Sequence, residues 1–171
     1  MSHRRIYHVP HGTPYHVGNS LRGIRRAARL GHDAIDLDLQ ITRDGVVVNT
    51  HWGQPLLRDG FYDPAGKIPR TARVRDLTWR EVQRLRTRDG YRIRRLRRVL
   101  RECKRAGIEA CVEPKADRRF KHDWIWHTIR ADADAANTTV TVRALRNLPT
   151  PGAGTRRVQA ARRAGFEAWT I

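Results

Sequence analysis

Apolar side chains along this chain recur with two different periods, and each period predicts one kind of element. In residues 33–41 every second side chain is apolar, which predicts a strand with one apolar and one polar face. In residues 21–30 the apolar side chains recur at three- and four-residue spacing, which predicts a helix. Asn19 or Ser20 can cap the start of this helix, and Gly31 marks its end.

The same two periods predict the remaining elements. Further strands are expected at residues 4–9, 46–51, 108–114, 138–142 and 166–171. Further helices are expected at residues 78–88, 94–106, 122–136 and 155–164. Strands that alternate with helices predict βα units around a mainly parallel sheet, so the expected fold class is α/β. A complete eight-stranded barrel of this kind needs about 250 residues. The 171 residues therefore predict a single domain, residues 1–171, in which any barrel is shortened after Lys115.

Ionisable side chains lie at the ends of three predicted strands. Asp36 and Asp38 share the polar face of one strand, Glu113 and Lys115 share a face of another, and His51 ends a third. In parallel α/β folds, functional sites form where the carboxyl ends of strands meet. Buried together, three carboxylates repel one another unless a positive charge lies between them, and oxygen ligands suit Mg²⁺ or Ca²⁺. The alternative is that both aspartates face solvent on an edge strand and pair with arginines.

The chain is strongly basic, with 35 lysine and arginine residues, 17 acidic residues and a formal net charge of +18. Residues 70–105 alone hold fifteen basic and four acidic side chains, a local net charge of +11. Such a field attracts phosphates, nucleic acid or an anionic lipid surface. The arginines also fit a simpler interpretation, in which they form the solvated face of helices whose other face is apolar.

The sequence predicts no transmembrane segment, because it contains no run of about eighteen apolar residues. The basic N-terminus is not followed by the apolar core of a signal peptide. Cys103 and Cys111 form neither a disulfide framework nor a metal-binding pair. We therefore expect a cytoplasmic protein.

Residues 31–51 closely resemble the core motif of the glycerophosphodiester phosphodiesterase family. That motif reads G-A-D-x-I-E-L-D-V-x-x-T-x-D-G, followed by an apolar strand and a histidine, and Asp36 stands here in place of its glutamate. Shorter segments resemble other family motifs in the same order along the chain: Gly12–Tyr15, Asn19–Leu21, Asp76–Val82, Leu96–Leu100, Val112–Lys115 and Gly165–Ile171. The matches cover most of residues 6–115 and the last few residues.

The resemblance implies a TIM-barrel-like fold that is shortened in its C-terminal half. It also implies metal-dependent hydrolysis of a small-molecule glycerophosphodiester to glycerol phosphate and an alcohol. Asp36, Asp38 and Glu113 would hold the divalent cation, Mg²⁺ or Ca²⁺. The alternative is a catalytically weakened barrel that binds nucleic acid or another polyanion through its arginine-rich helices.

The resemblance also implies roles for the histidines and for two basic side chains. One general base and one general acid are needed, and His51 would supply one of them. The family triplet H-R-G is disturbed here, so either His8 or His11 would supply the other. Lys115 and Arg58 would contact the substrate phosphate.

Overall fold

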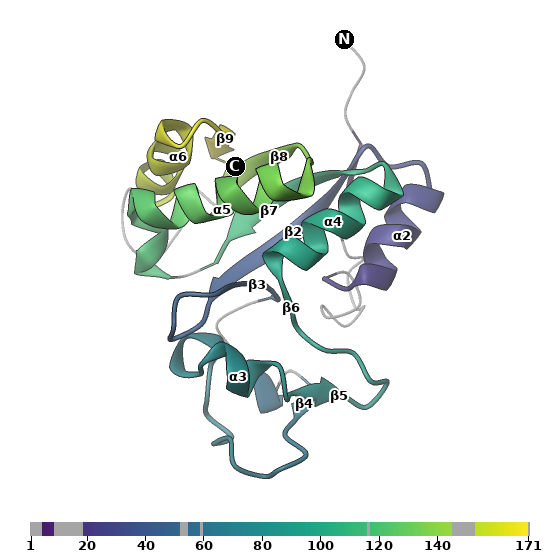
Figure 1. Cartoon of the computed structure of the whole chain (residues 1–171), viewed down its shortest axis with the longest axis vertical. Helices are drawn as coiled ribbons and strands as arrows, with labels where there is room; N and C mark the ends of the chain where they lie inside the picture. The colour runs from purple at the N-terminus through teal and green to yellow at the C-terminus, as the bar shows by residue number, and fades with distance from the viewer. Residues whose placement is uncertain are drawn as a thin grey trace.

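The computed structural model describes residues 5–8, 19–51, 55–58, 60–115, 117–144 and 153–170, and the predicted site residue His11 lies outside them. Five parallel strands run through its centre: β1 (Ile6–Tyr7), β2 (Ala34–Ile41), β7 (Glu109–Pro114), β8 (Val140–Ala144) and β9 (Glu167–Thr170). β2 pairs with both β1 and β7, and β8 and β9 follow in order (Figure 1). No described strand joins β9 back to β1, so the sheet that the structure describes is open.

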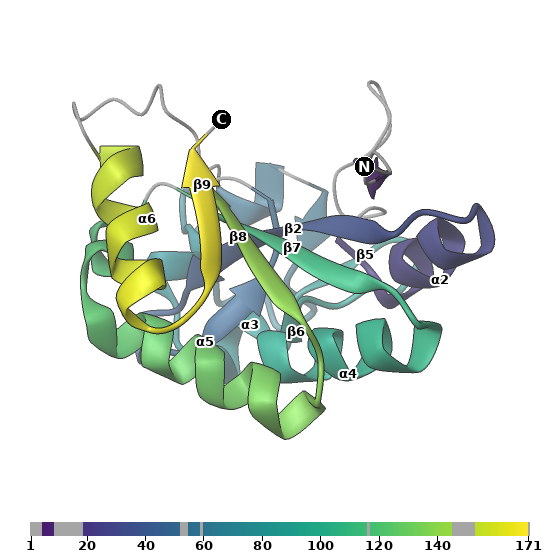
Figure 2. The ribbon, with the colours of Figure 1, turned by 90° about the horizontal axis from the view of Figure 1, so that it is seen from above.

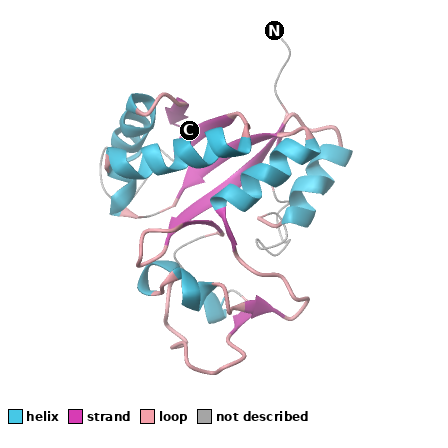
Figure 3. Ribbon diagram, viewed as in Figure 1, coloured by secondary structure: helices cyan, strands magenta, loops and turns pink. Residues whose placement is uncertain are grey.

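Four longer helices pack against one face of this sheet, as Figures 2 and 3 show. They are α2 (Leu21–Arg29), α4 (Leu96–Ala106), α5 (Asp123–Ala136) and α6 (Ala153–Arg163). The core between helices and strands is apolar because each strand turns its apolar side chains toward the helices. In β2 these are Ile35, Leu37, Leu39 and Ile41, all fully buried. The arrangement is a mixed α/β fold of the TIM-barrel-like kind, shortened as the sequence predicted.

A smaller lobe lies between β2 and α4 along the chain. It contains β3 (Val47–Asn49), η1 (Leu56–Arg58), β4 (Phe61–Tyr62), η2 (Val74–Asp76), α3 (Trp79–Val82), β5 (Arg86–Thr87) and β6 (Arg94–Arg95). β3 pairs antiparallel with β2, and β6 continues the main sheet beyond β3. The lobe has its own apolar cluster around Val48, Leu56 and Phe61. It therefore extends the sheet at the carboxyl end of β2.

The predicted helix 78–88 is wrong in length, because α3 covers only Trp79–Val82. Thr78 and Glu81 form a capping box that begins α3 correctly. Arg86–Thr87 then pair as a strand with β4, and the chain turns after this strand at Gly90, whose φ is +80°. The other predicted helices and strands agree with the structure to within a few residues.

Candidate active site

The three predicted metal-binding carboxylates lie together on the polar face of two neighbouring strands. Asp38 of β2 lies opposite Glu113 of β7 in the parallel register, and Asp36 precedes Asp38 on the same face. Their exposed fractions are 7% for Asp36, 6% for Asp38 and 3% for Glu113. The alternative that both aspartates face solvent on an edge strand is therefore wrong, because β2 is paired on both sides and buries them.

Two cationic side chains lie among these carboxylates. The Nζ atom of Lys115 lies 2.7 Å from Asp38 Oδ1 and 2.6 Å from Glu113 Oε1. Arg143, on β8, donates through Nη2 to Asp36 and, at 3.1 Å, to Glu113 Oε2. Burial opposes the charge of Lys115, but Asp38 and Glu113 outweigh it and raise the pKa of the ammonium group. Lys115 therefore stays charged and partly neutralises the cluster.

Asn19 holds Asp38 in place from the start of α2. Its Nδ2 donates to Asp38 Oδ2 at 2.7 Å, and its Oδ1 accepts from the Asp38 backbone N–H at 2.9 Å. Ser20 is the residue that caps α2, because its side chain accepts from the Gly23 N–H. Of the two cap candidates in the sequence, one therefore caps the helix and the other orients a carboxylate of the site.

His8 and His51, the two predicted catalytic histidines that the structure describes, also lie in this region. His8 follows β1, and its Nε2 lies 3.5 Å from Asp36 Oδ2. His51 follows β3, is 7% exposed, and its carbonyl accepts a hydrogen bond from the Gln40 amide. Burial, reinforced by the charge of Lys115 and opposed by Glu113, lowers the pKa of His51 to about 3. Its imidazole is therefore unprotonated at neutral pH, as a general base must be, and a pKa this low also makes it a weak base.

The described part of the structure does not place Arg58 or His11 at the carboxylate cluster. Arg58 ends η1 with an exposed side chain that makes no ion pair or hydrogen bond to the site residues that the structure describes. His11 lies outside the described residues. Their roles stay predictions. Arg143 was missed, because the predicted strand stopped at Val142, yet the alternation of β8 places residue 143 on the face of Glu113.

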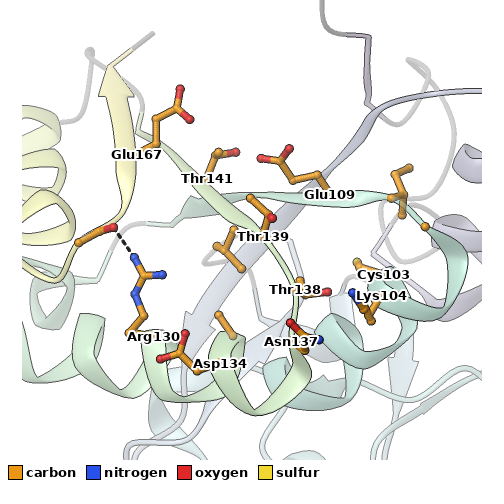
Figure 4. A pocket seen from close by; sticks show the side chains of 15 residues that line it. Cys103, Lys104, Glu109, Arg130, Asp134, Asn137, Thr138, Thr139, Thr141 and Glu167 are labelled. Carbon is orange, nitrogen blue, oxygen red and sulfur yellow. Dashed lines mark hydrogen bonds between the residues drawn. The ribbon is translucent and has the colours of Figure 1, made fainter.

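A separate pocket of about 790 Å³ opens at the amino ends of β7, β8 and β9. Figure 4 shows Glu109, Thr141 and Glu167 projecting from these three strands to the same side of the sheet. None of the predicted site residues lines this pocket. Because barrel-type enzymes carry their chemistry at the carboxyl ends of the strands, we place the candidate active site at the carboxylate cluster instead.

Asp36 combines a raised pKa with a carboxylate oxygen that has no hydrogen-bond donor among the described residues. Burial raises its pKa to about 6; Arg143 opposes this shift, and the charge of Asp38 adds to it. Its Oδ1 atom is buried and accepts no hydrogen bond from any described residue. Among the described residues, no three histidine, cysteine or acidic side chains are arranged to hold a metal ion. The donor set itself, three buried carboxylates with one oxygen unsatisfied, suits a hard cation.

Replacing Asp36 with asparagine should change the pH dependence of stability. In the folded protein the raised pKa favours protonated Asp36, so this stabilisation is full below about pH 4 and is lost as the pH rises through about 6. Above that pH, ionised Asp36 lowers the free energy of unfolding by about 3 kcal/mol. Between pH 4 and pH 8, the unfolding free energy of Asp36→Asn should rise relative to wild type by up to this amount.

Denaturant unfolding in the presence of EDTA measures this difference. Asp134→Asn, which changes an exposed carboxylate on α5, is the matched control and should show no such trend. A difference between Asp36→Asn and wild type that stays constant from pH 4 to pH 8 would contradict the prediction.

The fold and the site together define a TIM-barrel-like α/β protein with a buried acidic and histidine-containing site at the carboxyl ends of its strands. Residues 11–142 match the model of the glycerophosphoryl diester phosphodiesterase family. This match covers more than half of the chain, and the chain therefore belongs to that family. No curated protein matches the sequence.

Solved structures of similar fold support this assignment at the level of architecture. One is a glycerophosphodiester phosphodiesterase from Parabacteroides distasonis, with 16% identity and a TM-score of 0.70 over 98% of this chain and 64% of that one. Another, from Thermotoga maritima, has 15% identity and a TM-score of 0.61 over 99% and 62%. A phosphodiesterase from Oleispira antarctica, solved with the product sn-glycerol-3-phosphate, has 12% identity and a TM-score of 0.66 over 98% and 64%.

The chain spans a little under two thirds of the length of these three proteins. In the part of the chain that the structure describes, no helix is both long and apolar enough to cross a membrane.

Proposed function

We propose that the protein hydrolyses glycerophosphodiesters to glycerol phosphate and an alcohol. The observation that carries this proposal is the buried convergence of Asp36, Asp38 and Glu113 beside Lys115 and His51 at the strand ends. The family match and the glycerol phosphate bound to the Oleispira antarctica protein support the substrate class. A small phosphodiester fits this site because it offers a phosphate anion to its cationic side chains.

Asp36, Asp38 and Glu113 are the residues that would hold a divalent cation, Mg²⁺ or Ca²⁺. When bound, such an ion supplies Lewis-acid stabilisation of charge on the phosphate oxygens. Asn19 fixes the orientation of Asp38, and Arg143 lies against the other two carboxylates. These contacts keep the three acidic groups on one face of the sheet.

The histidines carry the proton transfers in this proposal. His51 is unprotonated at neutral pH and accepts a proton from the water molecule whose oxygen forms the new bond to phosphorus. His8, beside Asp36, or His11 donates a proton to the leaving alkoxide. Lys115 binds a phosphate oxygen from the strand end, and Arg58 does so from η1.

The cytoplasmic location is likewise a prediction from the sequence.

The proposal is tested by measuring release of glycerol phosphate from glycerophosphocholine and glycerophosphoethanolamine with Mg²⁺ or Ca²⁺. We expect turnover that EDTA abolishes and that either ion restores. Asp38→Asn should abolish it as well, whereas Asp134→Asn on the exposed side of α5 should not. Absence of turnover in the wild-type protein with both ions, or equal activity in both variants, would refute the proposed function.

A further inference from the structure

A pocket rich in arginine lies in the smaller lobe, outside the candidate active site. It has a volume of about 430 Å³ and is formed by α3, β5, β6 and the first turn of α4. Trp79, Gln83 and Ile93 contribute to its wall. Its other lining residues are all arginines: Arg84, Arg86, Arg92, Arg94, Arg95 and Arg98. No acidic residue of the described chain lines it, and we call it the arginine pocket.

Elsewhere on the described surface several arginines form ion pairs with acidic side chains, and the arginines of this pocket do not. Arg25 lies 2.6 Å from Glu102, and Arg97 lies 2.8 Å from Asp132. Within the described residues, none of the six guanidinium groups of the arginine pocket forms an ion pair or a hydrogen bond. The Nε atoms of Arg84 and Arg86 are even buried without a hydrogen-bond partner.

Part of this concentration of like charge lies on paired strands. Arg94 and Arg95 form β6, which pairs with β3, and the buried side chain of Ile93 anchors the approach to that strand. The guanidinium carbon of Arg95 lies 4.8 Å from the ring centre of Trp79, a cation–π distance. Asp44, Asp63 and Glu102 offset part of this charge from outside the pocket. The lining itself holds six arginines and no acidic residue, so the pocket favours an anion that contacts several of them at once.

We propose that the arginine pocket binds single-stranded nucleic acid. A phosphate backbone offers repeated negative charges to successive arginines, and the recess beside Arg95 and Trp79 offers an indole ring on which an unpaired base can stack. A membrane surface fits less well, because the basic faces that insert into a membrane carry exposed apolar side chains beside the charges. The large apolar side chains exposed among the described residues are Leu30, Tyr62 and Trp124, and none of them lines the pocket.

The test compares two variants that lose the same charge from different faces. Arg94→Gln/Arg98→Gln alters the arginine pocket, and Arg26→Gln/Arg29→Gln alters exposed side chains of α2. Affinity for a labelled oligothymidylate of about 16 nucleotides is measured by fluorescence anisotropy at several salt concentrations. For the pocket variant we expect at least about tenfold weaker binding and a salt slope reduced by about 1.4, which is 0.7 for each lost phosphate contact.

The α2 variant should keep the wild-type salt slope. If both variants weakened oligothymidylate binding equally, only the total charge would matter and the arginine pocket would not be the binding site. Duplex DNA that binds more tightly than the single strand would overturn the choice of ligand, as would stronger binding to vesicles of phosphatidylcholine and phosphatidylglycerol. This readout does not depend on hydrolysis, so it stands or falls separately from the proposed function.

Discussion

His51→Ala should lower kcat for glycerophosphodiester hydrolysis by about 10²- to 10⁴-fold, the usual contribution of a general base. The histidine is buried and is influenced by the charge of Lys115, and both effects keep its imidazole unprotonated at neutral pH. Because His51 is not one of the three proposed metal ligands, the affinity for Mg²⁺ should stay at the wild-type value. Steady-state kinetics and isothermal titration calorimetry measure the two quantities separately.

His51→Gln is the companion variant that retains the volume of this buried side chain. It should lose turnover as His51→Ala does, while thermal unfolding stays close to that of the wild-type protein. His127→Ala removes an exposed histidine of α5 and serves as the matched control. Retention of wild-type kcat by His51→Gln would exclude His51 as the base. The same assay on His8→Ala and His11→Ala identifies the general acid as the one whose loss lowers kcat.

Lys115→Gln should change metal affinity and turnover in opposite directions. Its ammonium group lies within 2.7 Å of both Asp38 and Glu113, so its removal leaves two carboxylates free for a divalent cation. A unit charge at about 4 Å is worth about 1–4 kcal/mol in such surroundings, which corresponds to at least about a fivefold tighter Mg²⁺ or Ca²⁺ affinity. Turnover should nevertheless fall, because the contact of Lys115 with the substrate phosphate is lost.

Calorimetric titration of Mg²⁺ and Ca²⁺ into both proteins measures the first effect, and the glycerophosphodiester assay measures the second. Lys104→Gln, which removes an exposed lysine from α4, controls for the change in net charge. If Lys115→Gln bound the ions more weakly than the wild-type protein, the ammonium group would not compete with them and the proposed ligand set would be wrong.

The alternation of side chains in the sequence was enough to predict that Asp36, Asp38 and Glu113 lie on one face of the sheet. It succeeded because helices cover only the apolar face of the sheet, so every second residue of a parallel strand must point to the other face. Arg143 escaped prediction because it lies one residue past the β-branched run that marked its strand. Which arginine enters a cluster depends on neighbouring strands, and that information is not local.

The smaller lobe was harder to predict, for a different reason. Val82 and Leu85 have the three-residue spacing of one helix face, but the helix stops after one turn. These side chains are buried in the separate cluster of the lobe, and the Gly90 turn reverses the chain toward β6. Tertiary packing of short elements overrode the local period there.

The two faces of the central sheet divide the tasks of folding and chemistry. The layer that holds the molecule together lies between the strands and helices α2, α4, α5 and α6, whereas the opposite face carries Asp36, Asp38, Glu113 and Arg143. A substitution on the polar face therefore leaves the apolar interior intact. Different side chains on this face would therefore alter the chemistry of the site while the helix-covered layer beneath it stays the same.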